Sequence, residues 1–355
     1  MSDALRFGLV GAGRIAEAYA QAFEGLGTGS TIAKITAVAD VRPEAARALA
    51  GRLGCASFDS HSDMSADMSA TGRLDAVLVC TPPATHSEIA RHFLRRRIPV
   101  LCEKPLSVDV RGARLMTQAA RRSGVLLAMA SKFRYVEDVI TARCLVESGA
   151  IGALVMAENC FASRIDMSAR WNSDPALSGG GVLIDNGTHS VDLMRLFLGP
   201  LVDVQIVEGP RSQRLAVEET VRLFVRNAAG VVGSIDLSWS LAKETDSYLT
   251  LYGTEGVLQV GWKESRYRRT SSPEWISFGK GYDKVQAFRS QIEHFAQAVR
   301  GRGDLRTTTE EAVACVEVIE AAYAALHGSR WTAVTAAPER LRRPHALALV
   351  SGGHG

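Results

Sequence analysis

The sequence predicts an α/β domain with a doubly wound parallel sheet, followed by an α+β domain with an open, mostly antiparallel sheet. Over residues 1–130, short apolar runs alternate with segments of helical period, as in parallel sheets covered on both faces. After about residue 150, longer runs alternate apolar with polar residues, as in half-exposed antiparallel sheets. The 355 residues suffice for two domains. We place them at 1–130 and 131–337, with a poorly ordered tail at 338–355.

The first domain is expected to alternate strands and helices along the chain. A glycine closes the helix at 43–54, and Thr85 with Glu88 three residues later forms a capping-box pattern. Continuous apolar strands between such helices indicate a buried parallel sheet. The expected strands are 6–13, 35–40, 74–80, 99–105 and 125–131, and the expected helices are 14–23, 43–54, 85–97 and 111–124.

The second domain is expected to be mostly strands, with two helices at its end. No internal repeat interrupts this pattern. The expected strands are 153–163, 201–209, 218–227, 231–240, 247–254 and 256–262, and the expected helices are 285–301 and 307–328.

The composition is that of an ordinary globular protein, 46% hydrophobic and 22% charged. The formal net charge of +3 gives no reason to expect a nucleic-acid or membrane partner. No apolar run approaches the roughly 20 residues of a membrane span, and the N-terminal apolar residues fit a strand better than a signal peptide. The 6 cysteines form no CxxC pair, so we expect free thiols in a reducing cytoplasm.

A glycine pattern, Gly11-x-Gly13-x-x-Ala16, follows the first strand and opens the first helix. Glycine permits the tight turn and lets a pyrophosphate approach the backbone N–H groups at the helix N-terminus. Because strand, helix and following strand are all in place, the pattern predicts a Rossmann dinucleotide site. We expect cofactor contacts here at Gly11, Gly13, Arg14, Ile15 and Ala16.

The second strand ends at Asp40, where a carboxylate can accept hydrogen bonds from the adenosine ribose hydroxyls. Its distance from Gly13 exceeds the usual ~20 residues, which we attribute to a loop insertion at 24–31. Asp40 favours NAD, since a carboxylate repels a 2′-phosphate. Arg42 and Arg14 can attract that phosphate or stack on adenine, so NADP stays open as an alternative.

The segment 80–86 follows the third strand, at the carboxyl edge of the sheet where open α/β folds bind ligands. We expect Thr81 and Pro82 to border the cofactor. His86 is a further candidate contact, with a purely structural role at the helix start as the alternative.

The segment 179–199 leads from three glycines into an apolar run that carries Asp185, His189 and Asp192. In a helix, offsets of four and seven put these side chains on one face. From the residues alone they are satisfied core groups, ligands or proton-transfer groups. We expect no metal site, because no third nitrogen or sulfur ligand stands at a metal-like spacing.

With these motifs the chain resembles the glucose–fructose oxidoreductase/inositol dehydrogenase (Gfo/Idh/MocA) family. The resemblance covers nearly the whole chain. It implies a Rossmann domain, then an open-sheet domain, and NAD(P)-dependent hydride transfer between nicotinamide and a secondary alcohol or ketone of a sugar, cyclitol or derivative. The matching segments are 8–16, 77–86, 102–107, 147–154, 179–192 and 252–258.

The same resemblance implies the catalytic residues. Glu103 and Lys104 belong to an EKP segment at a strand end beside the nicotinamide. Lys104 is expected to hold the substrate oxygen and stabilise its alkoxide character. His189 is expected to take the hydroxyl proton, while Asp185 orients the substrate and stabilises the imidazolium. We assign Asp192 to structural support.

Substrate contacts are expected on two segments. Lys132 and Arg134 lie just past the fifth strand, in a region that borders the substrate in the family. The loop at 163–175 offers Arg164, Trp171 and Asn172, which can bind sugar hydroxyls or a carboxylate, with solvated loop residues as the alternative. A cyclitol, a free sugar, a sugar acid and a nucleotide-linked sugar all stay open.

Two other function classes compete with a dehydrogenase: a non-catalytic dinucleotide-binding regulatory protein, and an NAD-dependent glycosidase of the same fold. Lys104, Asp185 and His189 together argue against the regulator, because a sensor needs no proton-transfer set. We expect a small polyhydroxylated substrate. We also expect a homo-oligomer, dimer or tetramer, because a half-exposed sheet leaves apolar surface to cover.

Overall fold

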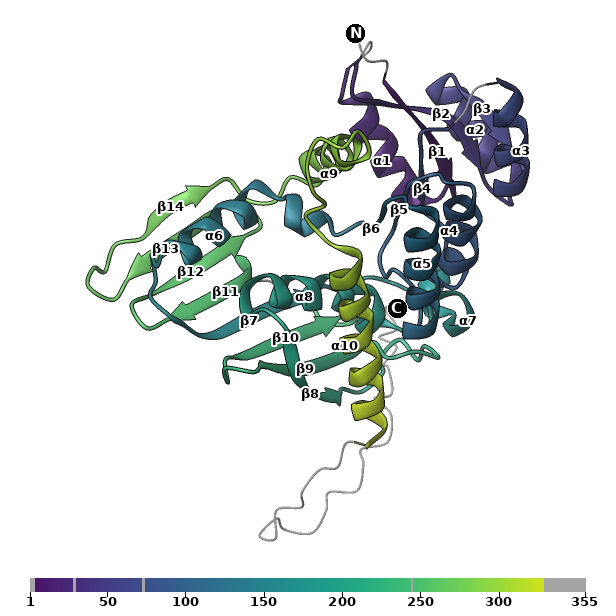
Figure 1. Cartoon of the computed structure of the whole chain (residues 1–355). Helices are drawn as coiled ribbons and strands as arrows, with labels where there is room; N and C mark the ends of the chain where they lie inside the picture. The colour runs from purple at the N-terminus through teal and green to yellow at the C-terminus, as the bar shows by residue number, and fades with distance from the viewer. Residues whose placement is uncertain (1–3, 28–29, 72–73, 244, 329–355) are drawn as a thin grey trace, which may run out of the picture.

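The computed structural model describes residues 4–27, 30–71, 74–243 and 245–328, arranged around two sheets (Figure 1). The tail expected at 338–355 lies outside these residues. None of the described helices is long and apolar enough to cross a membrane. All 6 cysteines have free thiols.

The first sheet has 6 parallel strands in the order β3-β2-β1-β4-β5-β6. This order reverses direction between β1 and β4, which confirms the doubly wound prediction. β3 was not expected, because its three residues are largely exposed and show no apolar run. The strands are β1 (Leu5–Val10), β2 (Ala33–Ala39), β3 (Ala56–Phe58), β4 (Ala76–Val79), β5 (Val100–Cys102) and β6 (Leu127–Met129).

The helices of this domain begin and end at residues with clear physical roles. In α5, the Asp109 carboxylate accepts a hydrogen bond from the Gly112 backbone N–H at 2.6 Å. The capping box expected at Thr85 is wrong. Its hydroxyl donates to the Pro82 carbonyl at 2.8 Å, and a 3-10 turn leads into α4. The helices are α1 (Arg14–Glu24), α2 (Pro43–Leu53), α3 (His61–Thr71), α4 (His86–Arg95) and α5 (Val110–Ser123).

The second sheet has 8 strands in the order β14-β13-β12-β11-β7-β10-β9-β8. Every neighbouring pair is antiparallel except β7 and β10, which run parallel. Strands β13 and β14 were not expected. The strands are β7 (Leu154–Ala162), β8 (Leu201–Glu208), β9 (Thr220–Asn227), β10 (Val232–Ser238), β11 (Ser247–Gly253), β12 (Gly256–Gly261), β13 (Ser265–Arg269) and β14 (Ile276–Gly279).

One face of the second sheet is covered by helices and the other is open. Helix α8 lies on β7 and β10, and α10 packs on α8 (Figure 1). On the open face, Arg222, Phe224 and Arg226 of β9 are exposed while their neighbours in the strand are buried. The helices are α6 (Glu137–Glu147), α7 (Pro175–Ser178), α8 (Val182–Leu198), α9 (Lys284–Val299) and α10 (Thr309–Gly328).

Helix α9 returns to the first sheet, where it packs beside α1 (Figure 1). Its Phe295 lies 6.1 Å from the ring of Phe7 on β1, and Phe288 lies 4.3 Å from Tyr19 on α1. The apolar core of the first sheet is therefore completed by residues from far along the chain. Helix α9, which lies within the expected second domain, thus packs on the first.

Candidate active site

A cavity of about 1080 Å³ lies between the carboxyl edge of the first sheet and the second sheet. Glu103 and Lys104, just past β5, line one side of it. Lys132, just past β6, and His189 of α8 line the cavity with them. The structure thus brings together residues that the sequence separates by more than eighty positions.

Lys104 and Asp185 form an ion pair across this cavity edge. The Lys104 ammonium donates to the Asp185 carboxylate, and also to the Asp185 backbone carbonyl at 3.0 Å. The two side chains keep 15% and 23% of their surface exposed, so a substrate can still reach both. The peptide bond between Lys104 and Pro105 is cis. The pair joins the end of β5 to the first turn of α8.

His189 lies one helical turn after Asp185 and lines the cavity. The Phe133 ring packs edge-on against its imidazole at 5.1 Å. Neither ring nitrogen is hydrogen-bonded to any of the described residues. Burial, helped by the positive charges of Lys104 and Lys132, holds the pKa of His189 well below its usual value. The imidazole is therefore neutral at neutral pH and can accept a proton.

The three glycines before α8 let the chain pass close to two other elements. Gly179 has a positive φ of 80°, which disfavours any residue with a Cβ atom. A Cβ on Gly180 would overlap the Tyr323 hydroxyl, and one on Gly181 would overlap the backbone oxygen of Glu218. Larger residues at these positions would displace the start of the helix that carries Asp185.

Glu218 caps this helix with a buried carboxylate. Its Oε1 accepts hydrogen bonds from the backbone N–H groups of Gly181 at 2.9 Å and Leu183 at 3.0 Å. The Tyr323 hydroxyl donates to the same oxygen at 2.8 Å. A negative charge at a helix N-terminus is stabilising. No local pattern predicts this cap, because Glu218 follows α8 by twenty positions.

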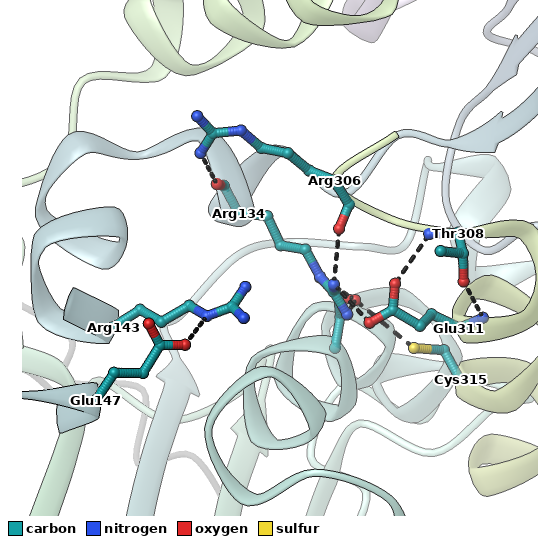
Figure 2. A network of polar contacts seen from close by, with 8 residues as sticks. Arg134, Arg143, Glu147, Arg306, Thr308, Glu311 and Cys315 are labelled. Carbon is teal, nitrogen blue, oxygen red and sulfur yellow. Dashed lines mark hydrogen bonds and ion pairs between the residues drawn. The ribbon is translucent and has the colours of Figure 1, made fainter. Parts of the chain in front are cut away.

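Asp192 has the supporting geometry that we expected of it. Its carboxylate accepts from Arg134 Nε at 2.9 Å and 3.1 Å. Arg134 also donates to Glu311 of α10 at 2.9 Å, and the thiol of Cys315 lies 3.7 Å from the Asp192 carboxylate (Figure 2). Both Arg134 and Asp192 are 3% exposed. None of these residues belongs to the cavity lining, so the network positions α8, and Arg134 is not the substrate contact that its segment suggests.

Lys132 presents a cation with no hydrogen-bonded carboxylate among the described residues. Its ammonium lies over the rings of Phe133, Tyr282 and Phe288, at 5.2, 5.6 and 5.7 Å from their centres. Burial, with the nearby positive charges of Lys104 and Lys284, lowers the pKa of Lys132 to about 8. The resulting site combines a cation with a flat aromatic surface.

The glycine turn has the geometry that a pyrophosphate requires. Gly11 has a φ of 95°, and a Cβ there would lie 2.7 Å from the backbone of Cys80. A Cβ on Gly13 would meet nothing within 4 Å, so the helix N-terminus is open. Asp40 accepts from the Ala12 backbone N–H at 2.7 Å and from the Arg42 backbone N–H at 2.9 Å. Its carboxylate is thus held in place beside the turn.

The remaining cofactor candidates divide into edge and core positions. Thr81 and Pro82 are half-buried at the sheet edge, Arg14 is exposed, and Ile15 lines the cavity. Ala16 is wholly buried, so its side chain serves helix packing. For His86 the structure supports a purely structural role at the helix start. Its ring is fully buried, and its nitrogens lie 2.8 Å from the carbonyl oxygens of Pro105 and Thr81, which leaves none for a cofactor.

The loop at 163–175 does not bring its expected residues into the cavity. Ser163 and Ile165 line the cavity, but Arg164 between them does not. Trp171 is 43% exposed, and neither it nor Asn172 belongs to the lining. These three expected substrate contacts therefore lie outside this cavity, with Arg164 and Trp171 exposed and Asn172 half-buried.

Sequence reasoning missed several lining residues. Asn186 lies in the motif segment beside Asp185 but was not singled out, and the other three follow a strand or open a helix and carry no motif. They are Asn186, Trp262, Tyr282 and Lys284. No three His, Cys, Asp or Glu side chains among the described positions gather as metal ligands.

Comparison with known proteins agrees with this geometry. The model of the oxidoreductase family with an NAD-binding Rossmann fold matches residues 5–131, and the GFO/IDH/MocA C-terminal domain matches residues 139–259. The rhizopine catabolism protein MocA of Rhizobium meliloti is 28% identical over 334 residues, covering 89% of this chain and 93% of that protein. Inositol 2-dehydrogenase of Rhizobium meliloti is 26% identical, covering 90% and 96%.

Solved structures show the same fold. Levoglucosan dehydrogenase in complex with NADH and levoglucosan has a TM-score of 0.82 at 20% identity, covering 92% of this chain and 98% of that chain. GenD2 from gentamicin A biosynthesis, in complex with NAD, has a TM-score of 0.80 at 25% identity, covering 93% and 96%. The expected family and fold are confirmed: this chain belongs to the Gfo/Idh/MocA family of oxidoreductases, and its first domain is an NAD-binding Rossmann fold.

Proposed function

We propose that this protein is an NAD-dependent dehydrogenase that interconverts a secondary alcohol and a ketone on a sugar, a cyclitol or a derivative of one. The observation that carries the proposal is the arrangement of His189, Asp185 and Lys104. A neutral imidazole, with no hydrogen bond to its ring nitrogens from the described residues, lies one turn from a carboxylate that is paired with a lysine, and the imidazole and the lysine line one cavity. The named activities of the relatives, inositol and levoglucosan dehydrogenases among them, support the substrate class.

The cofactor fits the residues present. Gly11 and Gly13 leave the backbone at the start of α1 open to a pyrophosphate, and the Asp40 carboxylate can accept hydrogen bonds from the ribose hydroxyls. When bound, NAD supplies the hydride acceptor. We favour NAD over NADP because Asp40 repels a 2′-phosphate, although Arg42 lies beside it.

Three side chains at the cavity are expected to carry out proton transfer and to stabilise the charges that form. His189 accepts the hydroxyl proton of the substrate and returns it in the reducing direction. Lys104 donates a hydrogen bond to the substrate oxygen and stabilises the negative charge that develops there. Asp185 fixes the Lys104 ammonium and stabilises the imidazolium once His189 is protonated.

The test is to incubate the protein with NAD⁺ or NADP⁺ and a panel of cyclitols and sugars, and to follow the absorbance of reduced nicotinamide. We expect turnover with NAD⁺. His189→Ala should lower kcat by about 10²-fold or more while cofactor affinity is nearly unchanged. Tight cofactor binding without turnover of any substrate would favour a regulatory protein. Release of an aglycone without net cofactor reduction would favour a glycosidase.

A further inference from the structure

The cavity is rich in positive charge. Among the described residues, six lining side chains are basic and three are acidic, and two of the six, Lys104 and Lys243, are paired with carboxylates outside the lining; the whole chain is nearly balanced, with 41 basic and 38 acidic residues. A local excess of this kind attracts an anion and disfavours a cation. The basic side chains are Lys104, Lys132, Lys243, Lys263, Lys284 and Arg266.

We propose that the substrate is an acidic sugar or cyclitol whose carboxylate or phosphate binds between Lys132 and Lys284, while its reacting hydroxyl lies at Lys104 and His189. This inference rests on the proposed dehydrogenase function and narrows its substrate class.

Lys132 and Lys284 share one aromatic platform. Their ammonium groups lie 5.7 Å and 5.9 Å from the centre of the Phe288 ring. Lys132 comes from the segment after β6, and Lys284 is the first residue of α9. The fold therefore brings two cations from distant segments to the same side of the cavity. Two like charges repel each other, and an anion between them relieves that repulsion.

The charges of Glu103 and Asp185 act on Lys132 and partly offset its own, but both carboxylates are hydrogen-bonded to other groups. Asp185 is paired with Lys104. Glu103 accepts from the Tyr19 hydroxyl at 2.7 Å and from the Lys104 backbone N–H at 3.1 Å. Asp283 caps α9 by accepting from the Gln286 backbone N–H at 3.0 Å. Neither Lys132 nor Lys284 donates a hydrogen bond to a carboxylate within the described part of the chain.

The half-buried Lys132 ammonium packs on aromatic rings and has no hydrogen-bonded carboxylate among the described residues, so its charge is incompletely satisfied. Removing an ammonium from water has a cost that a hydrogen-bonded carboxylate would offset, and none of the described residues supplies one there. Lys104 already occupies the position expected to bind the reacting oxygen. Proton and hydride transfer therefore do not require Lys132, which can bind a second group of the substrate.

The experiment compares matched neutral and acidic substrates: glucose, glucuronate and glucose 6-phosphate, and likewise galactose with galacturonate. We expect kcat/KM to be at least about tenfold higher for the acidic partner of a pair, the size of one charge-assisted hydrogen bond. The carboxylate and phosphate arms show which anion is preferred. Lys132→Met should bring the acidic-to-neutral ratio close to one, and Lys284→Met should lower it. Lys34→Met, which removes an exposed lysine on β2, should leave it unchanged.

The ratio is the decisive readout, because a general loss of activity in Lys132→Met affects both members of a pair. Equal or better turnover of the neutral partner by the unmodified protein would overturn this inference and leave the dehydrogenase proposal standing. So would a rise in the KM for NAD⁺ in both variants at an unchanged substrate ratio, since the lysines would then bind the cofactor. Turnover of no substrate at all would instead contradict the dehydrogenase proposal itself.

Discussion

Arg134 and Asp192 form an ion pair that is almost sealed from solvent, with Nη2 and Oδ1 2.8 Å apart and each side chain 3% exposed. Arg134 lies two residues after Lys132, and Asp192 lies three residues after His189 on α8. The pair therefore fixes the segment that carries the cavity cation against the helix that carries the base. Glu311 extends the link to α10 (Figure 2).

Arg134→Met should destabilise the protein by roughly 3–5 kcal/mol, because it leaves the Asp192 carboxylate buried without its partner. The measurement is urea unfolding. The double variant Arg134→Met/Asp192→Leu should recover much of that loss, since neither charge remains.

The matched control is Arg143→Met, which breaks an ion pair whose side chains are 53% and 59% exposed (Figure 2). Exposed pairs contribute about 0–1 kcal/mol, so this variant should unfold almost like the unmodified protein. Equal effects of Arg134→Met and Arg143→Met would contradict the supporting role of the buried pair.

Gly181→Ala should displace the start of α8, because the new Cβ would overlap the backbone oxygen of Glu218. A backbone oxygen cannot move aside as a flexible side chain can. We expect a loss of roughly 1–3 kcal/mol in the free energy of unfolding, with kcat falling because Asp185 and His189 move with the helix.

Gly51→Ala is the control for this variant. Gly51 lies within α2, and a Cβ there would meet nothing within 4 Å. Alanine in a helix interior is favoured over glycine by about 0.5–1 kcal/mol, so this variant should be slightly more stable. A Gly181→Ala variant with unchanged kcat and stability would show that the helix start tolerates a side chain.

Much of the fold was predictable because it depends on local patterns. The glycine turn before α1 and the apolar parallel strands can each be recognised from a short stretch of sequence. Helix α3, HSDMSADMSAT, buries Met64 but shows no continuous apolar stripe, and β13, SRYRR, is mostly charged, so neither carries a clear periodic signal. Both elements form because tertiary contacts override weak local preference.

The candidate site was predictable where a motif marks it and not elsewhere. Lys104, Asp185 and His189 stand in recognisable segments, and the structure brings them together. Lys284 opens α9 and Glu218 lies just before β9, and neither belongs to a recognisable motif. Only the folded structure brings them close to the site. His86 shows the reverse case. Its position in a motif predicts a cofactor contact, but both of its ring nitrogens lie at hydrogen-bond distance from backbone carbonyl oxygens.

Asp40→Ser should shift cofactor preference from NAD⁺ toward NADP⁺. It removes the negative charge that repels a 2′-phosphate, while Arg42 remains beside the site. We expect the KM for NAD⁺ to rise by about tenfold, the value of one good charge-assisted hydrogen bond, and the KM for NADP⁺ to fall. Asp304→Ser removes an exposed carboxylate and should change neither KM. An unchanged cofactor preference in Asp40→Ser would mean that this carboxylate does not face the ribose.

The pH dependence of alcohol oxidation should report the charges around His189. Its imidazole must be neutral to accept a proton, and burial with Lys104 and Lys132 lowers its pKa well below 6.5. For the unmodified protein, kcat/KM should therefore stay level as the pH falls to 6.5 and decrease only below that. Lys132→Met removes one positive charge, which raises the pKa of His189 and moves the decrease to higher pH. Lys132→Arg keeps the charge and should keep the profile. A decrease already centred near 6.5, and unmoved by Lys132→Met, would mean that a group other than His189 takes the proton.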